Sequence, residues 1–157
     1  MVIRSIGDST LQLGYALAIS DLIIAPAMPS NTARAGGVLF PIVRSLCSAF
    51  DSEPGPTARR VGAFLMKNTF QCNAITSAMF MTSCAPNPLM VVLAAQTLNI
   101  QLDWGSWATA AIVPGAISLA LVPYILYKIY PPELKHTPEA KYIAARELVQ
   151  MGPMTYG

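Results

Sequence analysis

The polar side chains best placed to bind a ligand lie in a short segment, Pro29 to Gly37, between two apolar stretches. Three of them commonly cap helix N-termini: Ser30, Asn31 and Thr32. Because Pro29 ends any preceding helix, a new helix is expected to begin near Ala33. Free backbone N–H groups at a helix start attract anions, and Arg34 adds a positive charge there. The segment therefore predicts an anion-binding loop.

A second group of polar residues interrupts residues 68–102, which carry no charge. This run is longer than the roughly 20 residues that a straight membrane span needs. Near its middle, prolines on both sides of one asparagine prevent a regular helix. Non-helical backbone is tolerated at membrane depth only where it is buried in protein or lines a cavity, so this break is a second candidate for the site. Its candidate side chains are Thr82, Ser83 and Asn87.

Composition places these segments in a membrane protein. Hydrophobic residues make up 54% of the chain and charged residues 11%, and the mean hydropathy is +0.47. The net charge of +2 is small and scattered, which argues against nucleic acid as a partner. One histidine and three cysteines, in no metal-binding spacing, predict neither a metal site nor an enzyme.

Two architectures fit the apolar stretches 11–28 and 35–50 on either side of the first loop. Both stretches could cross the membrane, or they could form a re-entrant hairpin that returns to the same side. Three charges within the apolar span as a whole, at Asp21, Arg34 and Arg44, favour the hairpin, because such charges must face protein or a water-filled cavity. Arg34 could attract a substrate or could pair with Asp21. The Ser-Asn-Thr segment could also be an ordinary cap in a surface turn, and the second break could be a simple kink.

The remaining elements complete an all-α membrane protein. Residues 104–127 are uncharged, with tryptophan at one end and tyrosine at the other, which predicts a transmembrane helix kinked at Pro114 and Pro123. The positive-inside rule puts the basic linker and tail in the cytoplasm. The expected order is a hairpin (1–50), a cytoplasmic linker (51–67), a broken transmembrane helix (68–102), a kinked transmembrane helix (104–127) and a short cytoplasmic connector (128–157) with a helix over 138–150.

The chain resembles the divalent anion:sodium symporter family along nearly its whole length. The segments that carry the resemblance are APAMPSNTARAGG, RRVGAFLM, TSCAPNPLM, WGSWATAAIVPG, YPPELKHTPEA and MGPM. Within that family it is most similar to the 2-oxoglutarate/malate translocator and citrate (tartrate)/succinate exchanger branch. In that family the Ser-Asn-Thr motif forms the tip of a re-entrant hairpin, and a broken helix follows it.

The resemblance implies transport of dicarboxylates such as malate, 2-oxoglutarate, succinate and tartrate, by anion exchange with alternating access. It implies that Asn31 and Thr32 donate hydrogen bonds to a substrate carboxylate, and that the backbone from Thr82 to Asn87 completes the cavity. The implied setting is the lipid bilayer of the inner (plasma) membrane, as a multi-pass protein that is a homodimer when full length.

Two departures from the family pattern qualify this expectation. Full-length members contain two inverted repeats, whereas this sequence resembles the transport part of the first repeat, so the remaining transporter segments are expected partners. Pro26 stands where sodium-dependent relatives have a serine, and Arg34 fits the exchanger branch. Exchange without a cofactor is therefore preferred over a sodium-coupled symporter segment. The other alternative is a truncated membrane fragment that does not transport.

Overall fold

A computed structural model describes residues 9–137, and the secondary structure of these residues is helical apart from one isolated bridge between Ser9 and His136. The all-α prediction is confirmed for this range. Residues 1–8 of the predicted hairpin and the helix predicted over 138–150 lie outside the described residues. The helices are α2 (Thr10–Ile24), η1 (Ala25–Ala27), α3 (Asn31–Ala33), η2 (Arg34–Leu39), α4 (Phe40–Ala49), α5 (Gly62–Met79), α6 (Pro86–Leu98) and α7 (Trp104–Ile129).

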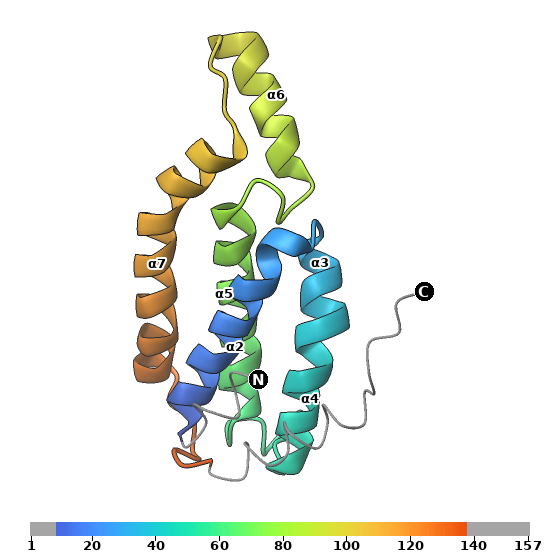
Figure 1. Ribbon diagram of the computed structural model, residues 1–157. Helices are drawn as coiled ribbons and strands as arrows, with labels where there is room; N and C mark the ends of the chain where they lie inside the picture. Colours follow the sequence, from blue (N-terminus) through green and yellow to red (C-terminus); the bar gives the residue numbers. More distant parts are fainter. Residues whose placement is uncertain (1–8, 138–157) are drawn as a thin grey trace.

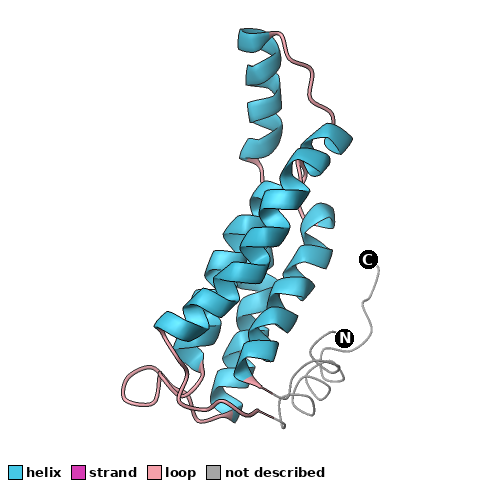
Figure 2. Ribbon diagram, turned by 90° about the vertical axis from the view of Figure 1, so that its left-hand side faces the viewer, coloured by secondary structure: helices cyan, strands magenta, loops and turns pink. Residues whose placement is uncertain are grey.

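Helix α5 is the centre of the bundle and packs against α2, α4 and α7, whereas α6 projects beyond the end of the bundle (Figures 1 and 2). The main core joins α2, α4 and α5, with Leu17, Leu46 and Phe64 among its buried side chains. Within residues 9–137, two segments are long and apolar enough to cross a membrane: Thr10–Ala27 and Trp104–Ile129. The second exposes a row of large apolar side chains, as a lipid-facing helix would.

The long uncharged run is helix, break and helix. Helix α5 ends at Met79 and α6 begins at Pro86, so the break spans residues 80–85. The helix resumes at a proline because the first turn of a helix needs no hydrogen bond from that residue. Helix α7 instead continues through both of its prolines and ends at Ile129, two residues later than expected.

The segment 51–67, predicted to be a linker throughout, is helical from Gly62 onward. A single lysine does not stop a helix, and the charge of Lys67 is accommodated at the end of the bundle. Its Nζ atom lies 3.7 Å from the centre of the Tyr130 ring, which gives a cation–π contact. Arg44, predicted to lie within an apolar stretch, is half exposed and pairs with Glu53 at 2.7 Å.

The start of α7 is fixed by a capping box in which Asp103 accepts from the backbone N–H of Ser106 at 2.7 Å. The Ser106 hydroxyl in turn accepts from the backbone N–H of Asp103 at 3.0 Å. The hydrogen bond from the Ser106 backbone N–H holds the pKa of the Asp103 carboxyl below its usual value. At the other end, Lys128 in the last turn complements the helix dipole.

Gly115 allows the close approach of α7 to α5. A Cβ atom at this position would lie 2.5 Å from Cγ and 2.6 Å from Sδ of Met79, which is buried. Gly115→Leu is therefore expected to lower the free energy of unfolding by about 1–3 kcal/mol through overpacking. A thermal melt of the purified protein in detergent would measure the loss.

Two variants control this prediction. Ala116→Leu makes a comparable change on the exposed side of the same helix and is expected to leave the melting temperature unchanged. Combining Gly115→Leu with Met79→Ala is expected to recover part of the loss, because the clashing side chain is removed. If Gly115→Leu had the same melting temperature as the unaltered protein, the close packing of α5 and α7 would be contradicted.

Candidate functional site

The first break comprises residues 25–30, between α2 and α3, and the second comprises residues 80–85, between α5 and α6. The two breaks are in direct contact, although they are far apart in the sequence. The Thr82 hydroxyl, in the second break, donates to the Pro26 carbonyl at 2.8 Å. The carbonyl of Ser83 accepts from Arg34 Nη1 at 3.1 Å. Figure 1 shows the turn between α2 and α3 beside the connection from α5 to α6. The structure thus joins the two candidate segments at one end of α5.

The first break begins the helical run that leads into α4. Ser30 is the N-cap of α3, and its side chain accepts from the backbone N–H of Ala33 at 3.2 Å, as the sequence predicted. The helix itself begins at Asn31, two residues earlier than expected. The Asn31 Oδ1 atom accepts from the backbone N–H of Thr32 at 2.9 Å and from its hydroxyl at 3.4 Å.

Asn31 and Thr32 keep hydrogen-bonding capacity at an accessible position. Asn31 is partly exposed and Thr32 is exposed. Within residues 9–137, the amide Nδ2 of Asn31 and its backbone N–H have no hydrogen-bond partner. Both groups are donors, and they lie at the positive end of a helix. This arrangement can bind a carboxylate.

Arg34 is fully buried, and all of its hydrogen-bonding capacity is used by the protein. Its Nε atom donates to Asp21 Oδ1 at 2.6 Å, and Nη2 donates to the hydroxyls of Ser77 at 2.8 Å and Thr76 at 3.3 Å. Nη1 donates to the carbonyls of Met28 at 3.2 Å and Ser83 at 3.1 Å. A guanidinium has five N–H groups, and each has an acceptor here. Of the two roles left open by the sequence, the structure shows the ion pair.

Asp21 is buried together with Arg34, and its carboxylate is equally well satisfied. Oδ2 accepts from the Thr76 hydroxyl at 2.5 Å, and the Asn73 amide lies 3.3 and 3.4 Å from the two carboxylate oxygens. Charges are tolerated in a protein interior when they are paired and hydrogen-bonded in this way. We call the six side chains of this cluster the buried network: Asp21, Arg34, Asn73, Thr76, Ser77 and Ser83.

The residues of the second break complete the C-terminal end of α5. The hydroxyl of Ser83, which is fully buried, lies 2.7 Å from the Ser77 carbonyl and 2.8 Å from the Phe80 carbonyl. The Asn87 amide donates to the same two carbonyls at 2.8 and 2.9 Å. Since the last carbonyls of a helix lack partners within the helix, these side chains replace the missing hydrogen bonds. The Thr82 hydroxyl donates to the Pro26 carbonyl and also accepts from Trp104 Nε1 at 3.2 Å. Thr82 therefore connects the second break both to the first break and to the start of α7.

The predicted site residues therefore fall into two groups. Ser30, Asn31, Thr32 and Thr82 lie at accessible or partly exposed positions, whereas Arg34 and Ser83 are fully buried and Asn87 caps α5. Sequence reasoning did not identify Asn73, Thr76 and Ser77. Their signal is the spacing of three to four residues, which puts polar side chains on one face of an uncharged helix.

Comparison with known proteins gives a consistent result. A family described as "Sodium:sulfate symporter transmembrane region" matches residues 1–157. YflS of Bacillus subtilis (strain 168), which carries a provisional description as a malate transporter, is 55% identical over 152 residues, covering 96% of this chain and 32% of the relative. Dicarboxylate transporter 1, chloroplastic, of Spinacia oleracea is 47% identical over 154 residues, covering 98% of this chain and 27% of that protein.

Inner membrane protein YbhI of Escherichia coli (strain K12) is 45% identical over 154 residues, which is 98% of this chain and 32% of that protein. The chain thus spans about a third or less of the length of each of these relatives.

Proposed function

This chain belongs to the sodium:sulfate symporter transmembrane region family, and on that premise we propose that it forms part of the substrate-binding region of a dicarboxylate transporter. The names of the spinach relative and of the provisionally described Bacillus protein support dicarboxylates, malate among them. We propose that the substrates are C4 and C5 dicarboxylates such as malate, succinate, tartrate and 2-oxoglutarate. They would be moved by exchange with alternating access.

The observation that carries this proposal is the unused donor capacity of Asn31 at an accessible helix start. The Asn31 amide would donate to one substrate carboxylate, with the Ser30 cap fixing the backbone. The Thr32 hydroxyl would join it by turning away from Asn31 Oδ1, to which it now donates at 3.4 Å. Thr82, which contacts the first break through the Pro26 carbonyl, would border the same cavity. Ser83 and Asn87 would shape the cavity by holding the end of α5.

The electrostatic attraction for a dianion would come from helix ends and not from a free arginine. Helix α3 begins at Asn31 and α6 begins at Pro86, on the two sides of the contact between the breaks. Each helix start carries the positive end of a helix dipole. At Asn31 a backbone N–H that is unpaired within residues 9–137 adds to this charge, whereas Pro86 and Pro88 have no N–H and the Asn87 N–H donates to the Cys84 carbonyl at 3.1 Å. Because the Arg34 charge is balanced by Asp21, its proposed role is to position the loop that binds the substrate.

For the membrane arrangement we propose that α2 to α4 form the re-entrant hairpin and that α5 and α6 form the broken helix. Both would enter from the cytoplasmic side of the inner membrane, in a transporter that is a homodimer when full length. The positive-inside rule supports this orientation, because the basic residues of the linker (Arg59 and Arg60) and of the end of α7 (Lys128) lie at the same end of the bundle. The linker and the segment after α7 are joined by backbone hydrogen bonds of 3.0 Å from Glu133 to Arg59 and from Leu134 to Arg60.

We propose exchange without sodium as the mode of transport. Pro26 supplies no side-chain oxygen for a cation, and one lone pair of its carbonyl accepts the Thr82 hydroxyl. Sodium-coupled symport is the second candidate, and the name of the family favours it.

The test replaces the matching third of a longer relative that exchanges dicarboxylates with residues 1–157 of this chain. This chimera, the intact relative and the 157-residue chain alone would be reconstituted in liposomes preloaded with malate. Uptake of labelled malate by the chimera, with and without sodium, is the expected result. A well-folded chimera that takes up no dicarboxylate, beside an active intact relative, would contradict the proposal. Exchange by the 157-residue chain alone would show that it works without further segments.

A further inference from the structure

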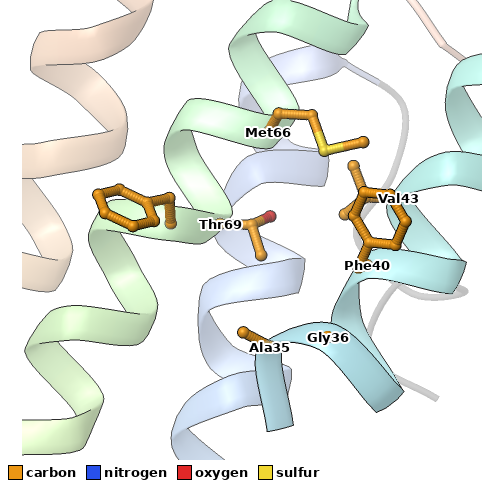
Figure 3. A pocket seen from close by; sticks show the side chains of 7 residues that line it. Ala35, Gly36, Phe40, Val43, Met66 and Thr69 are labelled. Carbon is orange, nitrogen blue, oxygen red and sulfur yellow. The ribbon is translucent and has the colours of Figure 1, made fainter. Parts of the chain in front are cut away.

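An apolar groove of about 260 Å³ lies between the turn η2, helix α4 and helix α5 (Figure 3). Gly36 and Phe40 line one side of the groove, and Met66, Thr69 and Phe70 line the other. It lies outside the buried network and apart from the loop at Ser30 to Thr32. Phe70 and Phe40 are 74% and 51% exposed, so the groove is open.

Thr69 supplies the feature that a hydrocarbon tail in the groove does not explain. Its side chain points into the groove in Figure 3, and the residue is only 9% exposed. The Oγ1 atom is buried and has no hydrogen-bond partner, which is true of no other buried side-chain oxygen or nitrogen among residues 9–137. Leaving a buried hydroxyl unpaired is costly, and a hydrocarbon tail offers it no partner. An occupant of the groove that carries a hydrogen-bonding atom would pair this hydroxyl.

The opposite wall is built for close contact. Gly36 and Gly37 are exposed, and a Cβ atom on either would find no neighbour within 4 Å. Nothing within the described bundle therefore requires glycine at these positions for space. In membranes, small residues on a helix surface allow a second helix to approach closely, and hydrogen bonds between helices add to the contact. Gly36 in the wall of the groove, across from an unpaired hydroxyl and followed by the exposed Gly37, fits the surface of another helix.

We propose that this groove binds a transmembrane helix from the remaining part of the full-length transporter, and that this helix supplies a hydrogen-bond partner for Thr69 Oγ1. The inference rests on the proposed function, because it takes this chain as the matching third of a longer protein. About two thirds of such a protein lies outside this chain and must pack against it. An acyl chain would fill the volume without pairing the hydroxyl. A second copy would need a self-complementary surface, whereas this surface is a groove.

Site-specific crosslinking in the chimera tests the occupant. A photoreactive benzoylphenylalanine at Phe70, on the rim of the groove, is expected to crosslink within the same chain to a peptide outside residues 1–157. The same probe at Ile112, on the exposed face of α7, serves as the control and is expected to label lipid. Mass spectrometry of the digested protein identifies the products. Lipid adducts alone at position 70, or a crosslink to a second copy, would overturn the proposal.

Substitution of Thr69 tests the hydrogen bond in the same chimera. Thr69→Val keeps the shape of the side chain and removes the hydroxyl, so the melting temperature in detergent is expected to fall. Thr69→Ser keeps the hydroxyl, and its melting temperature is expected to stay closer to that of the unaltered chimera. Thr109→Val makes the same change at an exposed position of α7 and is expected to have little effect. An unchanged or raised melting temperature for Thr69→Val would show that the hydroxyl has no partner and would overturn the proposal. Neither readout depends on transport, so a chimera that crosslinks but does not exchange malate contradicts only the proposed function.

Discussion

Replacing Arg34 with methionine is expected to lower the free energy of unfolding by about 3–5 kcal/mol, because it leaves the buried Asp21 carboxylate without its counter-charge. Such a loss is a large share of the roughly 5–15 kcal/mol that stabilises a typical protein. The change also removes the two hydrogen bonds that join Arg34 to Met28 and Ser83, and with them a direct link between the two breaks. The measurement is the melting temperature and folded yield of the chimera in detergent.

The same substitution at Arg44 is the matched control. Arg44 pairs with Glu53 at 2.7 Å, but the side chains are 45% and 46% exposed, and exposed ion pairs contribute about 0–1 kcal/mol. Arg44→Met is therefore expected to change the melting temperature little. Adding Asp21→Asn to Arg34→Met removes the uncompensated charge and is expected to recover part of the stability. If Arg34→Met and Arg44→Met melted alike, the ion pair between Arg34 and Asp21 would not be buried in the working protein.

Replacing Asn31 with alanine is expected to weaken dicarboxylate exchange while leaving the fold in place. A hydrogen bond to a charged group contributes about 1.5–3 kcal/mol, which corresponds to a loss of about 10- to 100-fold in substrate affinity. The fold should survive because Ser30, not Asn31, caps the helix. Asn31→Asp is expected to be worse, since it places a negative charge where the substrate carboxylate would bind. Exchange rates measured over a range of malate concentrations would show the loss as a raised KM.

Asn87→Ala separates a binding role from a structural one. The Asn87 amide already donates to the Ser77 and Phe80 carbonyls, so its removal is expected to lower the melting temperature more than Asn31→Ala does. Asn31→Ala should in turn affect the KM more than Asn87→Ala. Normal exchange with an unchanged KM in Asn31→Ala would exclude Asn31 from the substrate site.

Much of the local structure could be predicted from the sequence because it depends on neighbouring residues. Proline and the cap at Ser30 determine where the first break occurs, and Pro86 determines where α6 can begin. The length and composition of the apolar runs predict helices in a membrane. The start of α5 at Gly62 differs from the expected bound. There the backbone N–H groups of Val61 and Gly62 donate to the Ser52 hydroxyl at 3.2 and 2.9 Å, a contact that the local pattern does not indicate.

The sequence by itself determined the class of protein, the family and the two polar breaks, because composition, proline positions and motif spacing are local properties. Only the tertiary structure decided what Arg34 does. Its partners Thr76, Ser77 and Ser83 are 42 to 49 residues away, and a hydrogen bond is set by distance in space. The same packing left Thr69 Oγ1 unpaired in the groove that Gly36 lines, which no local pattern indicates. Because Arg34 is buried and paired with Asp21, its charge stabilises the fold and is not available to a substrate. In the described part of the chain, the unused hydrogen-bond donors at the accessible helix start are those of Asn31.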